Sequence, residues 1–407
     1  MTQIDRPAES VTTKVRIGGS PAPAGERGVP LLSSSGPDVV LGGADPLLGG
    51  VEVNASSLFG PRGACLLRPE GPLVVSDTGH HRLLVWSQRP DRDGRPADFL
   101  IGQPDFHSEG RNGGGEPHAA TVNVPTGVSR VGHGFAVADG WNSRVLIWRD
   151  LPTRSHQPAD VVLGQADFTG SMPNRGQSEV GAGTMHWPFA VLEHEGRLVV
   201  ADTGNRRVLI WDEIPTAHGT PADHVLGQPS LQSRSDNGGE AAGPGSFRWP
   251  HDLAVLDGQL LVSDAGNNRV LIFPDVPSRS GALAAAVLGQ ADFSGVDHNR
   301  GTYWPDARCM NMPYALTAWP GMVAVADTAS SRLLGFSAPL MPHDPDRGAS
   351  HLTGQEHFGI KGDNRWQAPA RDSLCWPYGI DAIPGAAVIA DTGNHRVLIW
   401  RREGEET

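Results

Sequence analysis

The residues best suited to bind a ligand or catalyse a reaction lie beside six prolines that recur along this 407-residue chain. Each proline belongs to a short motif, such as WPHDL (249–253) or WPYGI (376–380), whose flanking residues change from copy to copy. Cationic, anionic, imidazole, amide, thiol and phenol groups are all represented at these positions. We select ten candidate binding residues: Arg62, Asn123, His186, Arg248, His251, Asp252, Asn311, Tyr314, Cys375 and Tyr378. Mixed polar groups around one opening are typical of a ligand site.

Two kinds of site chemistry can be weighed from these residue types. His186, His251, Asp252 and Cys375 are metal-ligand types, but they come from separate motif copies and show no HxH, HxxxH or CxxC spacing. We therefore predict no cofactor, while calcium or zinc in a central channel stays open. Acid–base catalysis by the histidines and tyrosines would make the protein a lyase or hydrolase. No nucleophile motif accompanies them, so we assign no catalytic residue.

The three cysteines allow two interpretations. Cys65, Cys309 and Cys375 each lie close to one of the recurring prolines. They are either small buried side chains or a thiol cluster at one side of the opening, and reactivity would require a lowered pKa.

A second pattern must position these residues, since six segments resemble VVADTGNRRVLIW (199–211). Their aspartates and arginines are always five residues apart, and successive copies are 62 to 64 residues apart. The pairs are Asp77 and Arg82, Asp139 and Arg144, Asp202 and Arg207, Asp264 and Arg269, Asp327 and Arg332, and Asp391 and Arg396. A catalytic pair would not be needed six times. We predict that each pair pins a strand-to-strand turn.

Further periodic residues are also predicted to be structural. A Gly-Gln motif, as in VVLGQADF (161–168), follows five copies, and its glutamine is expected to bridge neighbouring blades. The aromatic residues that end the RVLIW-type segments should pack between blades. Asparagines recur in the intervening loops, at Asn112, Asn174, Asn237, Asn299 and Asn364, and we expect them to cap their own loops through Asx turns.

Each repeat predicts four short strands, with a Gly-Asn turn between the second and third. The fold is therefore expected to be all-β: a six-bladed β-propeller of four-stranded antiparallel blades. The last repeat has no fourth strand of its own, but PDVVLGGADPLL (37–48) is a spare copy. Segment 37–48 should complete the blade containing 377–400 and close the ring, which removes exposed sheet edges.

The DTGNxRVLIW motif and the proline motif that precedes it resemble the NHL repeat over roughly residues 37–402. The resemblance implies a six-bladed propeller, and propellers of this family commonly act as protein-interaction modules. The repeats here are longer than usual for the family, and the excess lies in loops such as 107–123, 169–186 and 232–248. These loops are expected to surround the mouth of the central channel.

The domain assignment follows from the repeats. We predict a flexible Pro/Gly/Ser-rich leader at 1–36, a propeller at 37–402 and a short tail at 403–407. No apolar run approaches the length of a membrane span, and the first 20 residues lack the apolar core of a secretory signal, so a cytoplasmic location is expected.

Three functions are compared on this basis. The favoured one is a protein-interaction scaffold that binds an unidentified protein partner through the loop-rich face, with a small-molecule ligand in the channel as a further expectation. The alternative is a lyase or hydrolase with its active site in the channel mouth. RNA binding is the lesser alternative, because a net charge of −12, with only Lys14 and Lys361 as lysines, repels a phosphate backbone.

Overall fold

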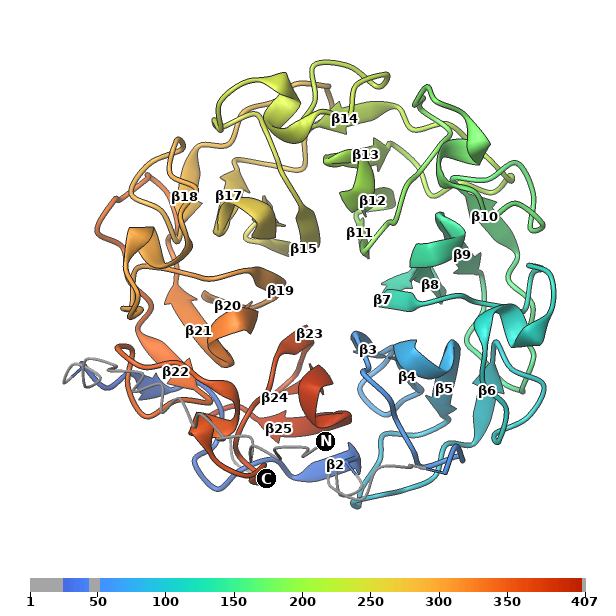
Figure 1. The fold of residues 1–407 in the computed structure, drawn as a ribbon, viewed down its shortest axis with the longest axis horizontal. Helices are drawn as coiled ribbons and strands as arrows, with labels where there is room; N and C mark the ends of the chain where they lie inside the picture. Colours follow the sequence, from blue (N-terminus) through green and yellow to red (C-terminus); the bar gives the residue numbers. More distant parts are fainter. Residues whose placement is uncertain (1–24, 44–51, 405–407) are drawn as a thin grey trace, which may run out of the picture.

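The chain folds into six blades around a central axis, each with four antiparallel strands, as predicted (Figure 1). A short fifth strand joins the outer edge of blade 5. The computed structural model describes residues 25–43 and 52–404. Within these ranges no α-helix is present, and no helix is long and apolar enough to cross a membrane. Numbered along the chain, blade 1 begins at residue 63 and blade 6 contains the last strand.

In blades 1 to 5 the strands are arranged from the axis outward in chain order, whereas the outermost strand of blade 6 comes from the N-terminal part of the chain. Blade 1 comprises β3 (Gly63–Leu66), β4 (Leu73–Asp77), β5 (Arg82–Trp86) and β6 (Phe99–Ile101). Blade 2 comprises β7 (Pro125–Val131), β8 (Gly134–Asp139), β9 (Arg144–Trp148) and β10 (Val161–Leu163). Blade 3 comprises β11 (Ala190–His194), β12 (Arg197–Asp202), β13 (Arg207–Trp211) and β14 (His224–Leu226). Blade 4 comprises β15 (Pro250–Leu256), β16 (Gln259–Asp264), β17 (Arg269–Phe273) and β18 (Ala286–Leu288). Blade 5 comprises β19 (Pro313–Trp319), β20 (Met322–Asp327), β21 (Arg332–Ser337) and β22 (His351–Thr353). Blade 6 comprises β23 (Pro377–Ile383), β24 (Ala386–Asp391), β25 (Arg396–Arg401) and β2 (Val39–Gly42).

The continuous apolar runs of the middle strands arise because both faces of every blade are covered by a neighbour. In β13, Val208 and Ile210 pack into the core between blades 3 and 4, whereas Leu209 and Trp211 pack into the core between blades 2 and 3. Successive side chains of a strand point to opposite faces, so a strand buried on both faces needs apolar residues at every position. Each of the six apolar clusters joins two adjacent blades.

Ring closure is confirmed for the described part of segment 37–48. In β2, Val39 to Gly42 pair antiparallel with Ile399 to Arg396 of β25, which supplies the missing fourth strand of blade 6. Leu41 is fully buried in the core between blades 6 and 1. Residues 44–48 of the predicted segment lie outside the described residues.

The leader boundary at residue 36 requires a correction. β1 (Val29–Pro30) pairs in parallel with β22 of blade 5, and Leu31 and Leu32 are each 1% exposed in the core between blades 5 and 6. This stretch therefore contributes to the propeller core, although its Pro/Gly/Ser-rich composition suggested no core at all. Residues 1–24 of the predicted leader, and 405–407 of the predicted tail, lie outside the described residues.

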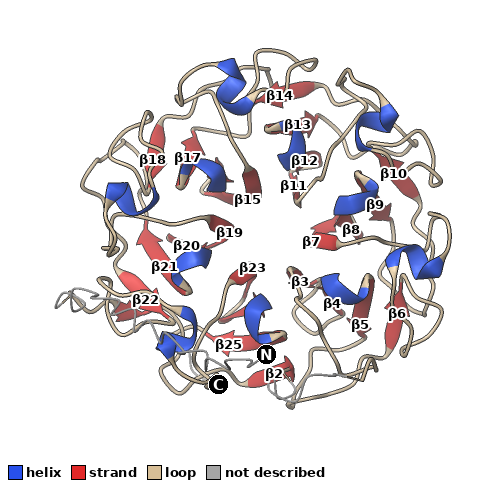
Figure 2. Cartoon of the chain, in the orientation of Figure 1, coloured by secondary structure: helices blue, strands red, loops and turns tan. Residues whose placement is uncertain are grey.

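Short 3-10 helices mark one face of the disc, which we call the loop face (Figure 2). One set forms the turns between the second and third strands: η1 (Thr78–His80), η3 (Gly140–Asn142), η5 (Thr203–Asn205), η7 (Ala265–Asn267), η9 (Thr328–Ser330) and η11 (Thr392–Asn394). The other set lies in the long loops between blades: η2 (Arg111–Gly114), η4 (Pro173–Gly176), η6 (Asp236–Gly239), η8 (His298–Gly301) and η10 (Asp363–Trp366). The predicted Gly-Asn turn is thus one turn of 3-10 helix, ended by a residue with positive φ such as Arg206.

Candidate functional site

The repeated aspartates and arginines form buried ion pairs beneath the loop face. In all six, the arginine Nε donates to the aspartate Oδ2 over 2.7 to 2.9 Å. Five of the pairs are 0% exposed on both sides, and in the sixth Arg396 is 8% exposed. Each guanidinium also donates to loop carbonyls: in blade 3, Arg207 reaches Leu231 O, Gly181 O and Thr184 O. These pairs therefore fix the loops as well as the turn.

The aspartates hold the candidate residues that lie two positions before each proline. His186 N and Arg248 N donate to the Oδ1 atoms of Asp202 and Asp264, at 2.8 and 2.9 Å. Asn123, Asn311 and Cys375 are held by the aspartates of their own blades in the same way.

The side chains at these positions do not enter the channel. His186 and Arg248 lie against the turn glycines Gly204 and Gly266, where an added Cβ would come within 3.0 Å of their atoms. Cys375 covers Gly393 in the same manner. Close approach, rather than a positive φ, explains the glycine in these turns. The expectation that His186 and Arg248 share one opening with His251, Tyr314 and Tyr378 therefore does not match the structure.

The side-chain hydrogen bonds of the recurring glutamines and asparagines differ from those predicted. Gln165 Nε2 donates to Asn142 O, Ser143 O and Met172 O, which all belong to its own blade or the loop that follows. Four of the five asparagines instead bond to the turn of the next blade, as Asn174 and Asn205 do through side-chain hydrogen bonds of 3.1 and 2.9 Å. Asn299 is the exception, because its side chain donates to Tyr303 O of its own loop. The prediction of a bridging glutamine was wrong, and the self-capping prediction missed the bonds that tie four of the asparagines to the next blade, because sequence spacing does not show which neighbour an amide faces.

Residues one position after the prolines converge on the axis and fill one end of the channel. Phe189 lies 4.5 Å from His251, His251 stacks on Tyr314 at 4.3 Å, and Tyr314 lies 4.6 Å from Tyr378, measured between ring centroids. Phe189 also meets Tyr378 across the axis at 6.5 Å. We call these four residues the aromatic plug. Arg62 stacks on its edge, with Cζ 5.1 Å from the centroid of the Tyr378 ring.

Burial determines the protonation of the plug. Desolvation lowers the pKa of His251 to about 4, so its imidazole is neutral at neutral pH. Desolvation also raises the pKa of Tyr314 and Tyr378, which keeps both phenols protonated. His251 is only 2% exposed, and its Nδ1 lies 3.0 Å from Trp249 O. The imidazole is therefore poorly placed for proton exchange with a substrate on the loop face.

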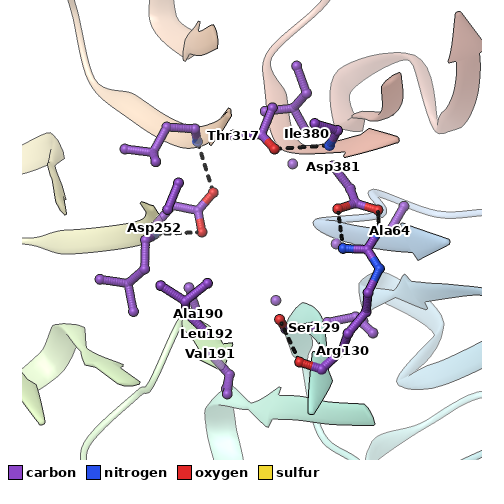
Figure 3. A pocket seen from close by; sticks show the side chains of 18 of the residues that line it. Ala64, Ser129, Arg130, Ala190, Val191, Leu192, Asp252, Thr317, Ile380 and Asp381 are labelled. Atoms are coloured by element: carbon purple, nitrogen blue, oxygen red, sulfur yellow. Dashed lines mark hydrogen bonds and ion pairs between the residues drawn. The ribbon is translucent and has the colours of Figure 1, made fainter. Parts of the chain in front are cut away.

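Beyond the plug, the channel contains a cavity of about 310 Å³ that is lined by the innermost strands of all six blades. Asp252 lies on one side, and Asp381 with Arg130 lies on the other (Figure 3). Arg130 pairs with Asp381 in a bidentate manner, at 3.1 and 2.7 Å. Ser129 and Thr317 add hydroxyl groups to the lining. This arrangement offers charged and polar groups to a small molecule inside the channel.

Sequence reasoning selected Asp252 but missed Asp381 and Arg130. Asp381 lies four residues after its proline, and Arg130 lies five residues after the equivalent proline of blade 2. The available signal was the occurrence of charged residues in inner strands where the other copies have mostly small or apolar residues. Only the ring places these residues, which are 251 positions apart in the chain, in contact.

The three cysteines do not form a cluster, because their neighbours differ. Cys65 lies beside Asp381 and Arg130, Cys309 bonds to Asp306 and Asn299, and Cys375 covers a turn glycine. Desolvation is the main reason that all three pKa values are raised, to about 12 for Cys309 and Cys375. These shifts oppose thiolate formation, so the thiol-cluster interpretation has no support here. Among residues 25–43 and 52–404, no group of three or more His, Cys, Asp or Glu is arranged to hold a metal ion.

Large apolar side chains are exposed mainly on the loop face. Of nine such residues in the described part of the chain, seven lie in its turns and loops: Phe59, Trp141, Met172, Val296, Tyr303, Trp366 and Trp376. Tyr303, Trp366 and Trp376, at 65%, 72% and 49% exposure, form what we call the blade-5 patch.

Contacts around Lys361 and η10 bring the three members of the patch together. Lys361 Nζ lies 4.0 Å from the centroid of the Tyr303 ring, and the adjacent Gly362 packs against the Trp366 indole. Trp376 N donates to Ser331 Oγ, which in turn donates to Asp363 Oδ1 of the same 3-10 helix. The patch therefore joins the loops before and after blade 5.

Comparison with known protein families supports the repeat assignment. The family model described as "NHL repeat" matches residues 247–273, and no curated protein matches the chain. Similar solved structures include the WD40 β-propeller domain of Doa1, with 8% identity over 91% of this chain and 97% of that one and a TM-score of 0.47. A gluconolactonase from Xanthomonas campestris has 13% identity over 93% and 99%, also with a TM-score of 0.47. A Kuenenia stuttgartiensis hydrazine synthase has 10% identity over 88% and 99%, with a TM-score of 0.48. Similarities this low carry no information on activity.

Proposed function

We propose that this six-bladed β-propeller, whose residues 247–273 match the NHL repeat, is a protein-interaction module that binds a protein partner through its loop face. The observation that carries the proposal is the concentration of exposed aromatic and apolar side chains on that face. Contiguous exposed apolar surface often marks an interaction site, and Trp, Tyr and Arg dominate binding energy at protein interfaces.

The loops that display these residues are held rigidly from below. In blades 1 to 5 the buried guanidinium fixes carbonyls of the loops on both sides of its blade, as Arg332 does with Phe358 O and Cys309 O around blade 5. The pair formed by Asn364 and Asn394 then ties η10 to blade 6. A surface that is already ordered loses little conformational entropy on binding, which favours affinity. The repeat residues thus build a platform, and the non-repeating residues on it would select the partner.

The alternatives have less support. A lyase or hydrolase in the channel mouth would use His251, Tyr314 and Tyr378, but these rings fill the mouth and pack against one another. RNA binding is opposed by the net charge of −12. A cytoplasmic location remains part of the proposal.

The test is loss of one defined partner on removal of the blade-5 patch. Wild-type protein and the Trp366→Ala/Trp376→Ala variant are compared for proteins cross-linked in cells of the source organism. The protein recovered with wild type is then purified, and its Kd is measured. We expect the double variant to raise Kd by at least tenfold, as loss of a hot spot of about 2 kcal/mol would do.

Leu283→Ala is the matched control, since Leu283 is 60% exposed but lies in the β17–β18 connection of blade 4, outside the blade-5 patch. It should bind like wild type. All three proteins should melt at the same temperature, because the altered side chains are exposed. Equal Kd values for wild type and the patch variant would show that the patch is not the interface.

A further inference from the structure

The channel cavity is separate from the loop face, and its composition indicates what it could bind. The plug residues Phe189 and Tyr378 border one end, and the lining continues to Glu193 and His194, next to the β11–β12 turn at the opposite end of the blade. Its volume of about 310 Å³ is close to the lower limit of typical ligand pockets, roughly 300–1,000 Å³. The cavity therefore suits a small molecule rather than a protein segment.

Side chains in the lining connect neighbouring inner strands by the same kind of bond. Asp252 of β15 accepts from Leu316 N of β19 at 2.9 Å, and Asp381 of β23 accepts from Leu66 N of β3 at 3.1 Å. In both cases the carboxylate links its own inner strand to that of the next blade, which is a structural role. The two aspartates differ in what else surrounds them.

Only one of these two carboxylates has a cation beside it. Asp381 is neutralised by the bidentate guanidinium of Arg130, whereas the described bonds of Asp252 come from two backbone amides, Leu316 N and Leu253 N. A desolvated carboxylate without a counter-ion is costly to keep charged. Desolvation accordingly raises the pKa of Asp252 to about 7, and the charge of Asp381 adds to the shift. A cation in the cavity would relieve this cost.

The opposite wall offers hydrogen-bond donors. A guanidinium has five N–H groups, and Arg130 uses three of them, on Leu66 O and the two oxygens of Asp381. Its side chain is 42% exposed, so the two remaining donors can meet a ligand. Between the two polar sides, Ala190, Val191 and Leu192 of β11 provide an apolar wall that suits methylene groups (Figure 3).

We propose that the channel cavity binds a small aliphatic ligand whose primary ammonium group pairs with Asp252 and whose acceptor group, a carboxylate or hydroxyl, meets Arg130. If Asp252 is protonated before the ligand binds, its carboxyl group must release that proton to solvent for the ion pair to form. The amine remains protonated throughout, so affinity should depend on the ionised fraction of Asp252.

Other charged and titratable groups also face the cavity and must be separated from Asp252. They are Asp381 and Tyr378 from β23, Arg130 from β7, Arg62 just before β3, and Glu193 and His194 from β11. His251 precedes Asp252 on β15 but belongs to the aromatic plug. Because Glu193 and His194 line the same cavity as Asp252, each needs its own control variant.

The experiment measures binding of defined probes to the full chain by NMR titration at pH 6 and pH 8. Ethanolamine and γ-aminobutyrate are the amine probes, and ethylene glycol and butyrate are matched compounds without an ammonium group. We expect only the amines to bind. With a carboxyl pKa of about 7, the ionised fraction rises about tenfold between these pH values, so Kd should fall about tenfold.

Variants assign the effect to one residue. Asp252→Asn keeps the size and an acceptor for Leu316 N, and it should abolish amine binding at both pH values. Glu193→Gln and His194→Asn should retain both the binding and its pH dependence. The pH series on wild-type protein remains a test even if Asp252→Asn fails to fold. Absence of amine binding, equal binding of ethylene glycol or butyrate, or binding of Ca²⁺ in place of the amines would each overturn the proposal. So would a Kd that does not change with pH.

Discussion

Replacing Arg207 with alanine should destabilise the propeller strongly. The side chains of Arg207 and Asp202 are both 0% exposed and joined at 2.8 Å, and the guanidinium also serves Leu231 O, Gly181 O and Thr184 O. Breaking a buried pair by removing one partner costs about 3–5 kcal/mol, because the remaining charge stays buried. The three loop carbonyls lose a charged donor as well, so we expect a loss in the upper part of that range.

The neighbouring arginine provides a matched control. Arg206 pairs with Asp236 at 2.7 Å, but the two side chains are 32% and 49% exposed. Exposed pairs contribute only about 0–1 kcal/mol, so Arg206→Ala should be close to neutral. Arg207→Lys keeps the charge but lacks the planar guanidinium that reaches Asp202 and the carbonyls together. The free energy of unfolding that it loses should therefore lie between the losses of the two alanine variants.

The assay is equilibrium urea unfolding followed by tryptophan fluorescence, with wild-type protein and the three variants compared at pH 7. Amide hydrogen exchange in loops 169–186 and 227–248 would show whether the loops bound by Arg207 become mobile first. If Arg207→Ala loses no more stability than Arg206→Ala, the buried pair does not hold the loops, and our explanation of the repeat is wrong.

Three further predictions concern the closure, the turns and the channel. A chain that begins at residue 44 lacks β1 and β2 and should melt far below wild type, whereas one that begins at residue 25 keeps both strands and should melt close to it. Gly204→Ala should cost about 1–3 kcal/mol in urea unfolding, because the new Cβ would collide with His186. The same change at Gly181 should be milder, since no atom lies within 4 Å of the new Cβ and φ is not positive there. Unfolding measured from pH 4 to 8 should show two opposing effects. The lowered pKa of His251 makes stability fall as pH drops from about 6.5 to about 4, and the raised pKa of Asp252 makes stability fall as pH rises from about 4 to about 7. The free energy of unfolding of Asp252→Asn should therefore rise relative to that of wild type as pH increases from about 4 to about 7. If the difference between the two proteins does not change with pH, the Asp252 carboxylate is not destabilised by burial.

The functional candidates were recoverable from the sequence only in part. Residues directly after the prolines, including His251, Tyr314 and Tyr378, do meet at the axis, because equivalent positions of a closed ring face its centre. Residues two positions before the prolines were grouped with them, yet His186 and Arg248 cover turn glycines. The direction of a side chain at an irregular junction depends on local dihedral angles, which repeat spacing does not contain.

The sequence by itself determined the blade number, the four-stranded blades and the closing role of Val39 to Gly42, because these depend on repeat period and on the pairing that an incomplete blade lacks. It also identified the Asp–Arg pairs as structural, since a residue needed six times cannot be unique to one site. Only the tertiary structure decided that Asp381 pairs with Arg130 while Asp252 has no cation beside it. The physical reason is that burial and partnership in the channel are set by side chains from different blades, hundreds of residues apart, whose contacts exist only once the ring is closed.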